Sequence, residues 1–425
     1  MTHTVSADRS VRTAGPKFVV AYIAALLGCY FALITPASVT VALRLQQIDP
    51  EHKVGALALA LGLGALLAVI SNPLFGHLSD RTTSRFGMRK PWLIVGIFGG
   101  TAGLLVVAFA TTTTTVVLGW CLTQVLFNAG LAALVALLPD QIPPERRGVV
   151  SALMGVCFPI AMIGGSFVAQ AVAGLPPFWM FLLPAIAAPI TVVILCAVLP
   201  DRRLDPAART PFAKRDIARM FSFRPRHNPP FAWACLMVFL LSAGFSTFTT
   251  YLVYYLSDVL GVGGGEIAHS AFVVNLIAFG IALPASLAGG WITDRFGRRG
   301  LMMISSAVML ALALAVMIVA RSVPMLYLSA AIAGVGLGGY FCGHFAVPAA
   351  LLSGDGEAAR EMGVVNIALT LPSSLVPVYG PALLSFGSSA STNYPVLFGS
   401  GVLACLLAIP VTRKIHGLNR GVERP

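Results

Sequence analysis

The stretch GHLSDRTTSRFGMRKPW, residues 76–92, decides how this sequence is interpreted. It places an aspartate, three arginines, a lysine and a histidine between two long runs of almost uncharged residues. A shorter version, GWITDRFGRRG, follows at residues 290–300. The same charged pattern, written twice in an otherwise apolar chain, indicates an internal duplication.

The composition of the chain is that of a membrane protein. Its 425 residues are 57% hydrophobic and only 10% charged, and its mean hydropathy is +0.86. Soluble globular chains carry about 25% charged residues. Segments that alternate apolar and polar residues, as the strands of a membrane barrel do, do not occur in the sequence. We therefore expect an all-α membrane protein.

Twelve apolar runs are each roughly 19 residues or longer, enough for a helix to cross a hydrocarbon core of about 30 Å. They cover residues 18–43, 54–75, 92–110, 116–138, 149–173, 178–199, 231–257, 267–289, 301–320, 324–352, 361–387 and 395–412. One long polar segment separates the first six from the last six. The predicted parts are an N-tail at 1–17, a six-helix bundle at 18–199, a central loop at 200–230, a second six-helix bundle at 231–412 and a C-tail at 413–425.

The basic residues predict the orientation of the chain. If both termini are cytoplasmic, all but Arg44, Lys53 and Arg321 of the 28 lysines and arginines fall on the cytoplasmic side. Such asymmetry is typical of multi-pass proteins of the plasma (inner) membrane. The net charge of +12 then faces anionic lipid, and no nucleic-acid partner is expected.

The two halves of the sequence repeat each other. GHLSDR at 76–81 aligns with GWITDR at 290–295, and FNAGLAALVALL at 127–138 aligns with FCGHFAVPAALL at 341–352, at the same offset. We expect two pseudo-symmetric six-helix halves in parallel orientation, an arrangement typical of secondary transporters that bind their solute between the halves near the midplane.

The repeated loop resembles the signature loop of the major facilitator superfamily. The residues that carry the resemblance are Gly76, Leu78, Ser79, Asp80, Arg81, Gly87, Arg89 and Lys90, with the second copy at Gly290, Thr293, Asp294, Arg295, Gly297, Arg298 and Arg299. The four extra residues at 82–85 are similar to the variant found in glycoside–pentoside–hexuronide cation symporters and sucrose-type transporters.

The resemblance implies that this loop gates the transporter, by contacts that hold the halves in an outward-facing state. The predicted gating residues are Gly76, Asp80, Arg81, Gly87, Arg89, Asp294, Arg295, Gly297 and Arg298. A carboxylate at Asp80 can pair with a guanidinium or accept backbone N–H groups at a helix N-terminus. The alternative is that these charges only fix the topology and anchor helix ends.

The ionisable residues inside the predicted spans are few. No aspartate or glutamate lies mid-span, whereas the sugar–cation symporters are expected to carry acidic residues in helices 2 and 4. His344 lies roughly 12 Å inside the tenth span at 1.5 Å per residue. An imidazole there can bind solute or relay a proton, or it can be a neutral side chain that bonds a neighbouring carbonyl.

Other polar side chains can line a central cavity. Gln124 and Asn128 share one helical face, which is costly in lipid, and the tyrosines near residue 251 either line the cavity or form an interfacial belt. The predicted cavity residues are Tyr30, Gln124, Asn128, Thr247, Tyr251, Asn275, Tyr340, His344 and Asn366.

The sequence thus predicts a secondary transporter of a small organic solute, with a slight preference for proton-linked export of a metabolite or drug-like compound. Sugar or glycoside import with a cation is the alternative, and a non-transporting sensor is a remote one. HExxH, P-loop and GxSxG motifs are absent from the sequence, so we expect no enzyme, cofactor or metal site. The expected partners are the solute, the lipid bilayer and protons, and we expect a monomer.

Overall fold

The computed structural model describes residues 15–204, 228–352, 358–387 and 393–415. Within these residues every regular element is a helix, and twelve spans are long and apolar enough to cross a membrane. The prediction of an all-α membrane protein with twelve spans in two halves is confirmed. Most of the predicted tails and of the central loop lies outside the described residues, so the domain boundaries stay predictions.

The amino-terminal half contains the first six spans. They are formed by α1 (Pro16–Thr35) with the π-helical turn η1 (Pro36–Thr40) and α2 (Val41–Ile48), α3 (Lys53–Asp80), α4 (Lys90–Ala108), α5 (Thr113–Gln141), α6 (Pro144–Ala171) and α7 (Trp179–Val198). The first span is continuous through Pro36, where a π-type turn accommodates the missing N–H of proline.

The carboxyl-terminal half repeats this arrangement. Its spans are α9 (Pro229–Thr250) with α10 (Leu252–Asp258), α11 (Gly264–Phe296), α12 (Arg299–Val319), α13 (Val323–Gly343) with α14 (Ala346–Ala349), α15 (Ala358–Ser385) and α16 (Tyr394–Arg413). The expected continuous helix over 324–352 is interrupted at His344, one turn before Pro348. Proline at 348 cannot donate a hydrogen bond to the carbonyl of His344, which explains why the break precedes it.

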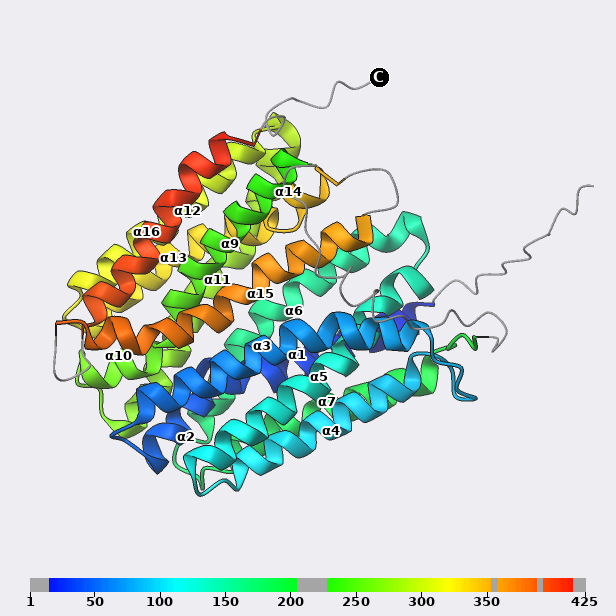
Figure 1. The fold of residues 1–425 in the computed structure, drawn as a ribbon, viewed down its shortest axis with the longest axis horizontal. Coiled ribbons are helices and arrows are strands. Elements are labelled where there is room, and N and C mark those ends of the chain that lie inside the picture. Colours follow the sequence, from blue (N-terminus) through cyan, green and yellow to red (C-terminus); the bar gives the residue numbers. More distant parts are fainter. Residues whose placement is uncertain (1–14, 205–227, 353–357, 388–392, 416–425) are drawn as a thin grey trace, which may run out of the picture.

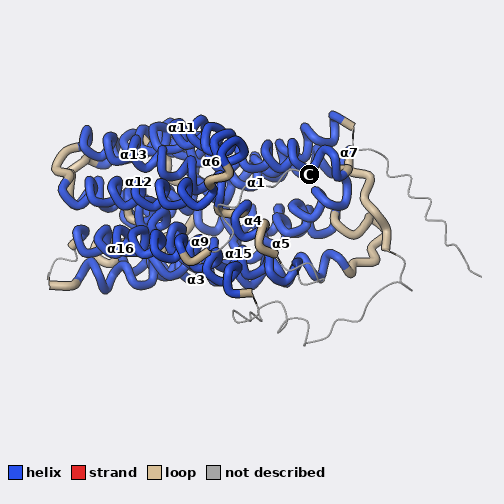
Figure 2. The backbone as a smooth tube through the Cα atoms, turned by 90° about the horizontal axis from the view of Figure 1, so that it is seen from above, coloured by secondary structure: helices blue, strands red, loops and turns tan. Residues whose placement is uncertain are grey.

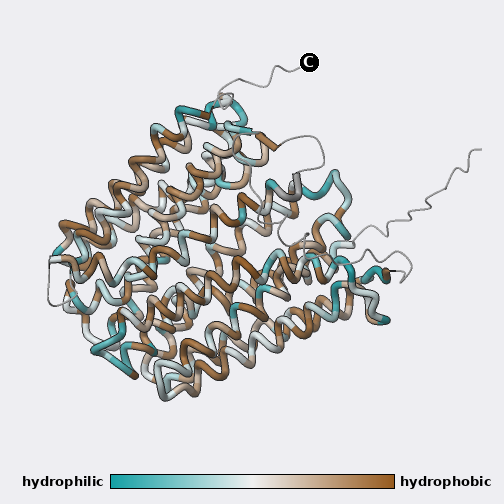
Figure 3. The backbone as a smooth tube through the Cα atoms, in the orientation of Figure 1, coloured by the Kyte–Doolittle hydropathy of each residue, from teal (hydrophilic) through white to brown (hydrophobic). Residues whose placement is uncertain are grey.

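The helices alternate in direction, and the two ends of the molecule can be named from this. We call the end where α1 begins and α16 finishes the terminal end, and the end that carries α2 and α10 the distal end (Figure 1). Polar residues gather at both ends and apolar residues cover the helices between them (Figure 3). This distribution matches a molecule that crosses a bilayer from end to end.

The two halves contact each other mainly through four helices. Helix α3 packs against α15, and α6 packs against α11, with the remaining helices of each half on either side (Figure 2). Gly62 permits one close approach, because a Cβ there would lie 2.6 Å from Cγ2 of Val378. The region between α6 and the carboxyl-terminal half is where the candidate site lies.

Candidate functional site

A phenylalanine from one half is inserted among three phenylalanines from the other. The ring of Phe158, at the middle of α6, lies 6.3 Å from the ring of Phe245, 6.2 Å from Phe279 and 5.8 Å from Phe341, measured between centroids. Phe245, Phe279 and Phe341 also contact one another, at 6.1 to 6.3 Å. We call these four residues the phenylalanine cluster.

The cluster bridges the halves and is not sealed from its surroundings. Phe158, Phe245 and Phe341 are half-buried, whereas Phe279 is fully buried. Phe158 meets Phe245 and Phe279 edge-on, at interplanar angles of 64°, the geometry that ring quadrupoles favour. Three of the four rings at this contact between the halves are therefore partly exposed.

The predicted cavity residues Tyr30, Tyr340 and His344 adjoin this cluster. The ring of Tyr30 lies 6.2 Å from that of Phe158. Tyr340 contacts Phe245 and Phe341, and its hydroxyl lies 2.8 Å from that of Ser242. The structure thus brings three of the predicted residues to one place.

His344 is held by the turn that precedes it. Its ring stacks on Tyr340 at 4.9 Å, lies 5.8 Å from Phe341, and its Nδ1 lies 3.0 Å from the carbonyl oxygen of Tyr340. Because a carbonyl only accepts hydrogen bonds, Nδ1 carries the proton in this arrangement. The other nitrogen, Nε2, is then an acceptor in the neutral ring.

Gln124 and Asn128 form a separate polar group with Asn72 of α3. The amide of Asn128 donates to the carbonyl oxygen of Gln124 at 2.8 Å and to its Oε1 at 3.1 Å, and the amide of Asn72 lies 3.5 Å from Oδ1 of Asn128. Hydrogen bonds thus link the three amide side chains to one another.

Two predicted cavity residues are packed inside the carboxyl-terminal half instead. Thr247 is fully buried and its Cβ faces Gly401 of α16. Tyr251 is fully buried as well, and its hydroxyl donates to the carbonyl of Pro377 at 2.8 Å. Whether these two residues line the cavity therefore stays a prediction.

Asn275 and Asn366 lie on the interface helices α11 and α15. Asn275 is 1% exposed, and its Oδ1 has no hydrogen-bond partner among the described residues. Asn366 is half-buried, and its carbonyl accepts the hydroxyl of Thr370 at 2.7 Å. Their role in binding solute stays a prediction.

The first signature loop forms an ion-pair network inside the amino-terminal half. Arg89, 4% exposed, lies 2.6 Å from Asp80 and 2.8 Å from Asp140, and also donates to Ser79. Asp201, which the sequence analysis did not single out, accepts the backbone N–H groups of Arg89 and Lys90 at 2.8 Å each. The carboxylate that accepts backbone N–H groups at the N-terminus of α4 is therefore Asp201. Asp80 instead pairs with the guanidinium of Arg89.

The other predicted gating residues of the first loop lie next to this network and have contacts of their own. Gly87 adopts a φ of 107°, where a side chain would be strained and would also meet Asp201. Gly76 packs loosely against Ala132 of α5, and Arg81 contacts His77 on the same helix.

The second loop copy is built differently. Gly297 ends α11 with a φ of 64°, a common helix stop, and Arg298 is the cap of α12. Arg295 lies over the ring of Trp291 at 5.6 Å, while Asp294 is exposed and forms no ion pair among the described residues. Gating by either copy stays a prediction.

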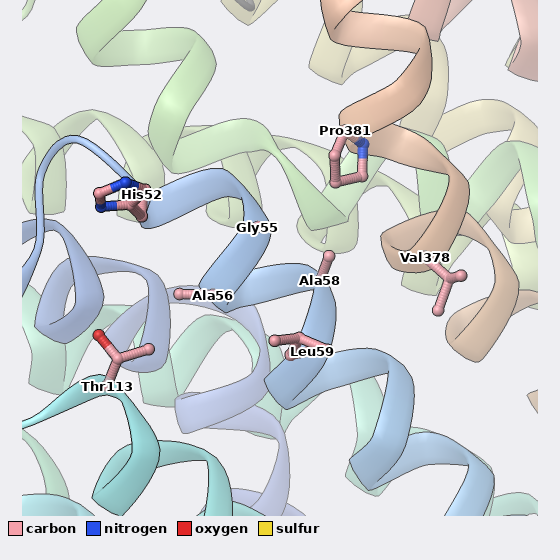
Figure 4. Close-up of a pocket in the computed structure, with 8 residues that line it drawn as sticks. All are labelled: His52, Gly55, Ala56, Ala58, Leu59, Thr113, Val378 and Pro381. Atoms are coloured by element: carbon pink, nitrogen blue, oxygen red, sulfur yellow. The ribbon is translucent and has the colours of Figure 1, made fainter.

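A groove of about 460 Å³ opens at the distal end, away from the phenylalanine cluster. It lies between the first two turns of α3 and the last turns of α15, and Figure 4 shows its lining. Its residues are His52, Gly55, Ala56, Ala58, Leu59, Thr113, Val378 and Pro381. The hydrogen bond that the ring of His52, at its rim, donates to the carboxylate of Asp49 at 2.9 Å raises the pKa of His52. Its mostly apolar walls do not suggest a site for a polar solute.

Sequence comparison identifies the family. The sequence model of the Major Facilitator Superfamily matches residues 18–285 and 265–424. The chain belongs to this superfamily. The superfamily consists of transporters, so the protein is a multi-pass membrane transporter of a small molecule and not an enzyme. The resemblance of the signature loop is confirmed at this level, whereas the narrower likeness to sugar–cation symporters stays a prediction.

Solved structures of superfamily transporters share the fold over nearly the whole chain. A bacterial homologue of the human lysosomal transporter Spinster, in an inward-facing and unoccupied conformation, aligns with a TM-score of 0.68 at 14% identity, over 94% of this chain and 96% of that one. The nucleoside transporter NupG aligns with a TM-score of 0.67 at 13% identity, over 95% and 99%. The human organic anion transporter MFSD10 (TETRAN) aligns with a TM-score of 0.66 at 16% identity, over 93% and 99%. No curated protein sequence matches the chain.

Proposed function

We propose that the protein is a secondary transporter that exports a weakly polar metabolite or drug-like compound, coupled to protons. The observation that carries this proposal is the phenylalanine cluster, which places uncharged aromatic rings from both halves at the centre of the molecule. Ring faces and edges bind flat apolar groups by dispersion and quadrupole contacts. A solute held between the halves contacts both of them and is carried through the change of state.

The charges around the cluster support a neutral solute. Among the described residues of the spans, Glu361 is the one acidic side chain that is buried, at 6% exposed. It lies in the first turn of α15, at the terminal end. A metal cation or a strongly cationic solute bound near the midplane would require oxygen ligands or counter-charges there. His344, stacked beside the cluster, is the ionisable group we assign to proton coupling.

A second candidate, import of a sugar or glycoside, is favoured by the amide group in the other half. Asn72, Gln124 and Asn128 could exchange their mutual hydrogen bonds for those of solute hydroxyls. The two functions differ in which residues bind solute, and this difference can be measured.

The test begins with a panel of solutes screened by the melting temperature of the purified protein, since a ligand that binds the native state raises it. Phe158→Leu retains most of the apolar volume and removes the ring. Under the proposal this variant loses the shift given by weakly polar ring compounds, whereas Phe109→Leu, at an exposed loop position, retains it. Shifts given only by sugars, and lost in Asn128→Ala, would favour import instead.

Coupling is tested in proteoliposomes loaded with a solute found in this screen. An imposed pH gradient should accelerate flux of the solute against the direction of proton flow. Flux that does not respond to the gradient would overturn proton-linked export while leaving the solute assignment intact.

A further inference from the structure

Within the described parts of the chain, hydrogen bonds between the two halves lie at the distal end. Among the described residues, every hydrogen bond that crosses from one half to the other joins α2 or the start of α3 to α10. The ring–ring contacts that cross between the halves lie elsewhere, at the phenylalanine cluster and between Phe167 and Phe272. Among the described residues, the distal hydrogen bonds are therefore the polar contacts that hold the two halves together.

An ion pair lies at the centre of this connection. Nζ of Lys53, the first residue of α3, is 2.6 Å from Oδ1 of Asp258, the last residue of α10. The two side chains are only 14% and 18% exposed. The second carboxylate oxygen of Asp258 accepts the hydroxyl of Tyr394 at 2.9 Å, and Ser257 donates to the first at 2.8 Å. Asp258 is thus oriented by its own half and presented to the other.

Tyr254 crosses the same boundary one turn away. It is fully buried, and its hydroxyl lies 3.2 Å from the carbonyl oxygens of both Ala42 and Lys53. Its ring lies 4.9 Å from the ammonium of Lys53, within the range of a cation–π contact. The tyrosine and the ion pair therefore hold the same segment of the amino-terminal half.

The charge pattern of the chain singles out Lys53 among three cations. Arg44, Lys53 and Arg321 are the basic residues that the predicted orientation places on the side opposite the others. Arg44 donates to the carbonyl of Ala110 in its own half, and Arg321 to the carbonyl of Ala320 beside it. Only Lys53 of these three bonds across the halves.

We propose that Lys53, Tyr254 and Asp258 form a gate that closes the distal end, and that the Lys53–Asp258 ion pair breaks each time this end opens. Separation of the pair costs Coulomb energy at low dielectric, but opening the end admits water to both charges, which returns part of their solvation. The opposing terms leave the closed and open states close in free energy, as alternating access requires.

The gate is tested without substrate, so the result does not depend on the proposed solute or coupling. Spin labels are attached to cysteines at Thr111 and Ser322, exposed residues in the distal loops of the two halves, in a cysteine-free background. Pulsed electron paramagnetic resonance then measures the distance distribution between the labels in lipid nanodiscs.

We expect one predominant short-distance population in the parent protein. Lys53→Met and Asp258→Asn should each raise the ratio of long to short distances roughly tenfold, a change of about 1.4 kcal/mol. The charge-exchanged double variant Lys53→Asp/Asp258→Lys should return the ratio towards that of the parent. Arg321→Met, which removes a distal cation without a cross-half bond, should leave it unchanged.

Tyr254→Phe provides a milder variant if loss of a charge prevents folding. It removes one hydroxyl and retains the buried ring, and we expect a smaller shift in the same direction. Distance distributions identical to the parent in Tyr254→Phe and in whichever charge variants fold would overturn the gate. A double variant that stays as open as the single ones would overturn the role of the ion pair.

Discussion

Arg89 illustrates how a single charge is stabilised at the edge of this apolar molecule. Its guanidinium is almost fully buried and bonds Ser79, Asp80 and Asp140, residues that end two different helices. An arginine suits this position because its planar fork can serve several acceptors at once. The residue therefore joins α3, α4 and α5 at the terminal end, whatever further role it has in gating.

We expect Arg89→Ala to lower the free energy of unfolding by about 2–3 kcal/mol, because it leaves Asp140 and Asp80 without their partner. The value is at the low end for such pairs, since Asp80 is 57% exposed and can be hydrated. Thermal unfolding in detergent measures it. Asp80→Asn is the matched control and should cost much less stability. Equal losses for the two variants would show that Arg89 does not hold the three helices together.

The sequence prediction for Asp80 concerns kinetics and not stability. Asp80→Asn should insert and fold but slow the transport cycle, because the loop is expected to stabilise one of the two end states. Flux measurements on reconstituted protein decide this. A turnover rate equal to that of the parent would reduce the Asp80–Arg89 pair to an anchor for helix ends.

His344 gives a prediction for the pH dependence. If its imidazole carries the coupled proton, His344→Gln should flatten the profile of transport rate against pH, because the group that takes up the proton is lost. Glutamine retains a side-chain hydrogen-bonding group but cannot take up a proton. An unchanged profile would assign His344 to packing against Tyr340.

Among the elements, helices α4 and α5 depend on glycine for their close contact. A Cβ at Gly96 of α4 would lie 2.4 Å from the backbone nitrogen of Gly130 of α5, so the two backbones meet directly. Small residues have this use in membrane helices, where contact between helices is driven by packing and not by exclusion of water.

Gly96→Ala should therefore destabilise the amino-terminal half, because the obstruction is backbone and cannot rotate away. Gly399→Ala in α16 is the matched control, since a Cβ there meets nothing within 4 Å and alanine favours a helix by about 1 kcal/mol over glycine. We expect a lower melting temperature for the first variant and an equal or higher one for the second. The reverse order would contradict the packing of α4 on α5.

The helices themselves were largely predictable from the sequence. All twelve apolar runs correspond to helical spans, because a helix is the form in which a single apolar segment satisfies its own backbone in lipid. The breaks within spans were less predictable. The interruption at His344 has a local cause in Pro348, whereas that at Tyr251 lies where the side chain bonds Pro377 of another helix.

At the scale of the whole molecule, the described residues pack differently at the two ends. The halves are bonded at the distal end, whereas a Cβ at Gly155, one turn from Phe158 on the terminal side of α6, would meet nothing within 4 Å. Residues three apart share a helical face, so Gly155 faces the same region as Phe158. We infer an approach to the phenylalanine cluster from the terminal end.

Gly155→Cys should therefore react with a membrane-impermeant thiol reagent applied to the side that carries the termini. Thr111→Cys, in an exposed distal loop, should react from the opposite side. Labelling of inverted and right-side-out vesicles gives both rates and also tests the predicted cytoplasmic location of the termini. Reaction of both cysteines from one side would contradict the assignment of the two ends.

By itself, the sequence determined the membrane class, the twelve spans, the duplication and the superfamily, because these depend on local hydropathy and on short motifs. It did not identify Phe158, Phe245, Phe279 or Phe341 as central, or Asn72, Lys53 and Asp258 as cross-helix partners. In a soluble protein the apolar face of a helix is the one that faces the protein interior. In lipid both faces of a helix are apolar, so hydropathy does not distinguish a phenylalanine between the halves from one that faces lipid. Only the tertiary structure showed which rings meet between the halves and that an isolated lysine has its aspartate across the interface.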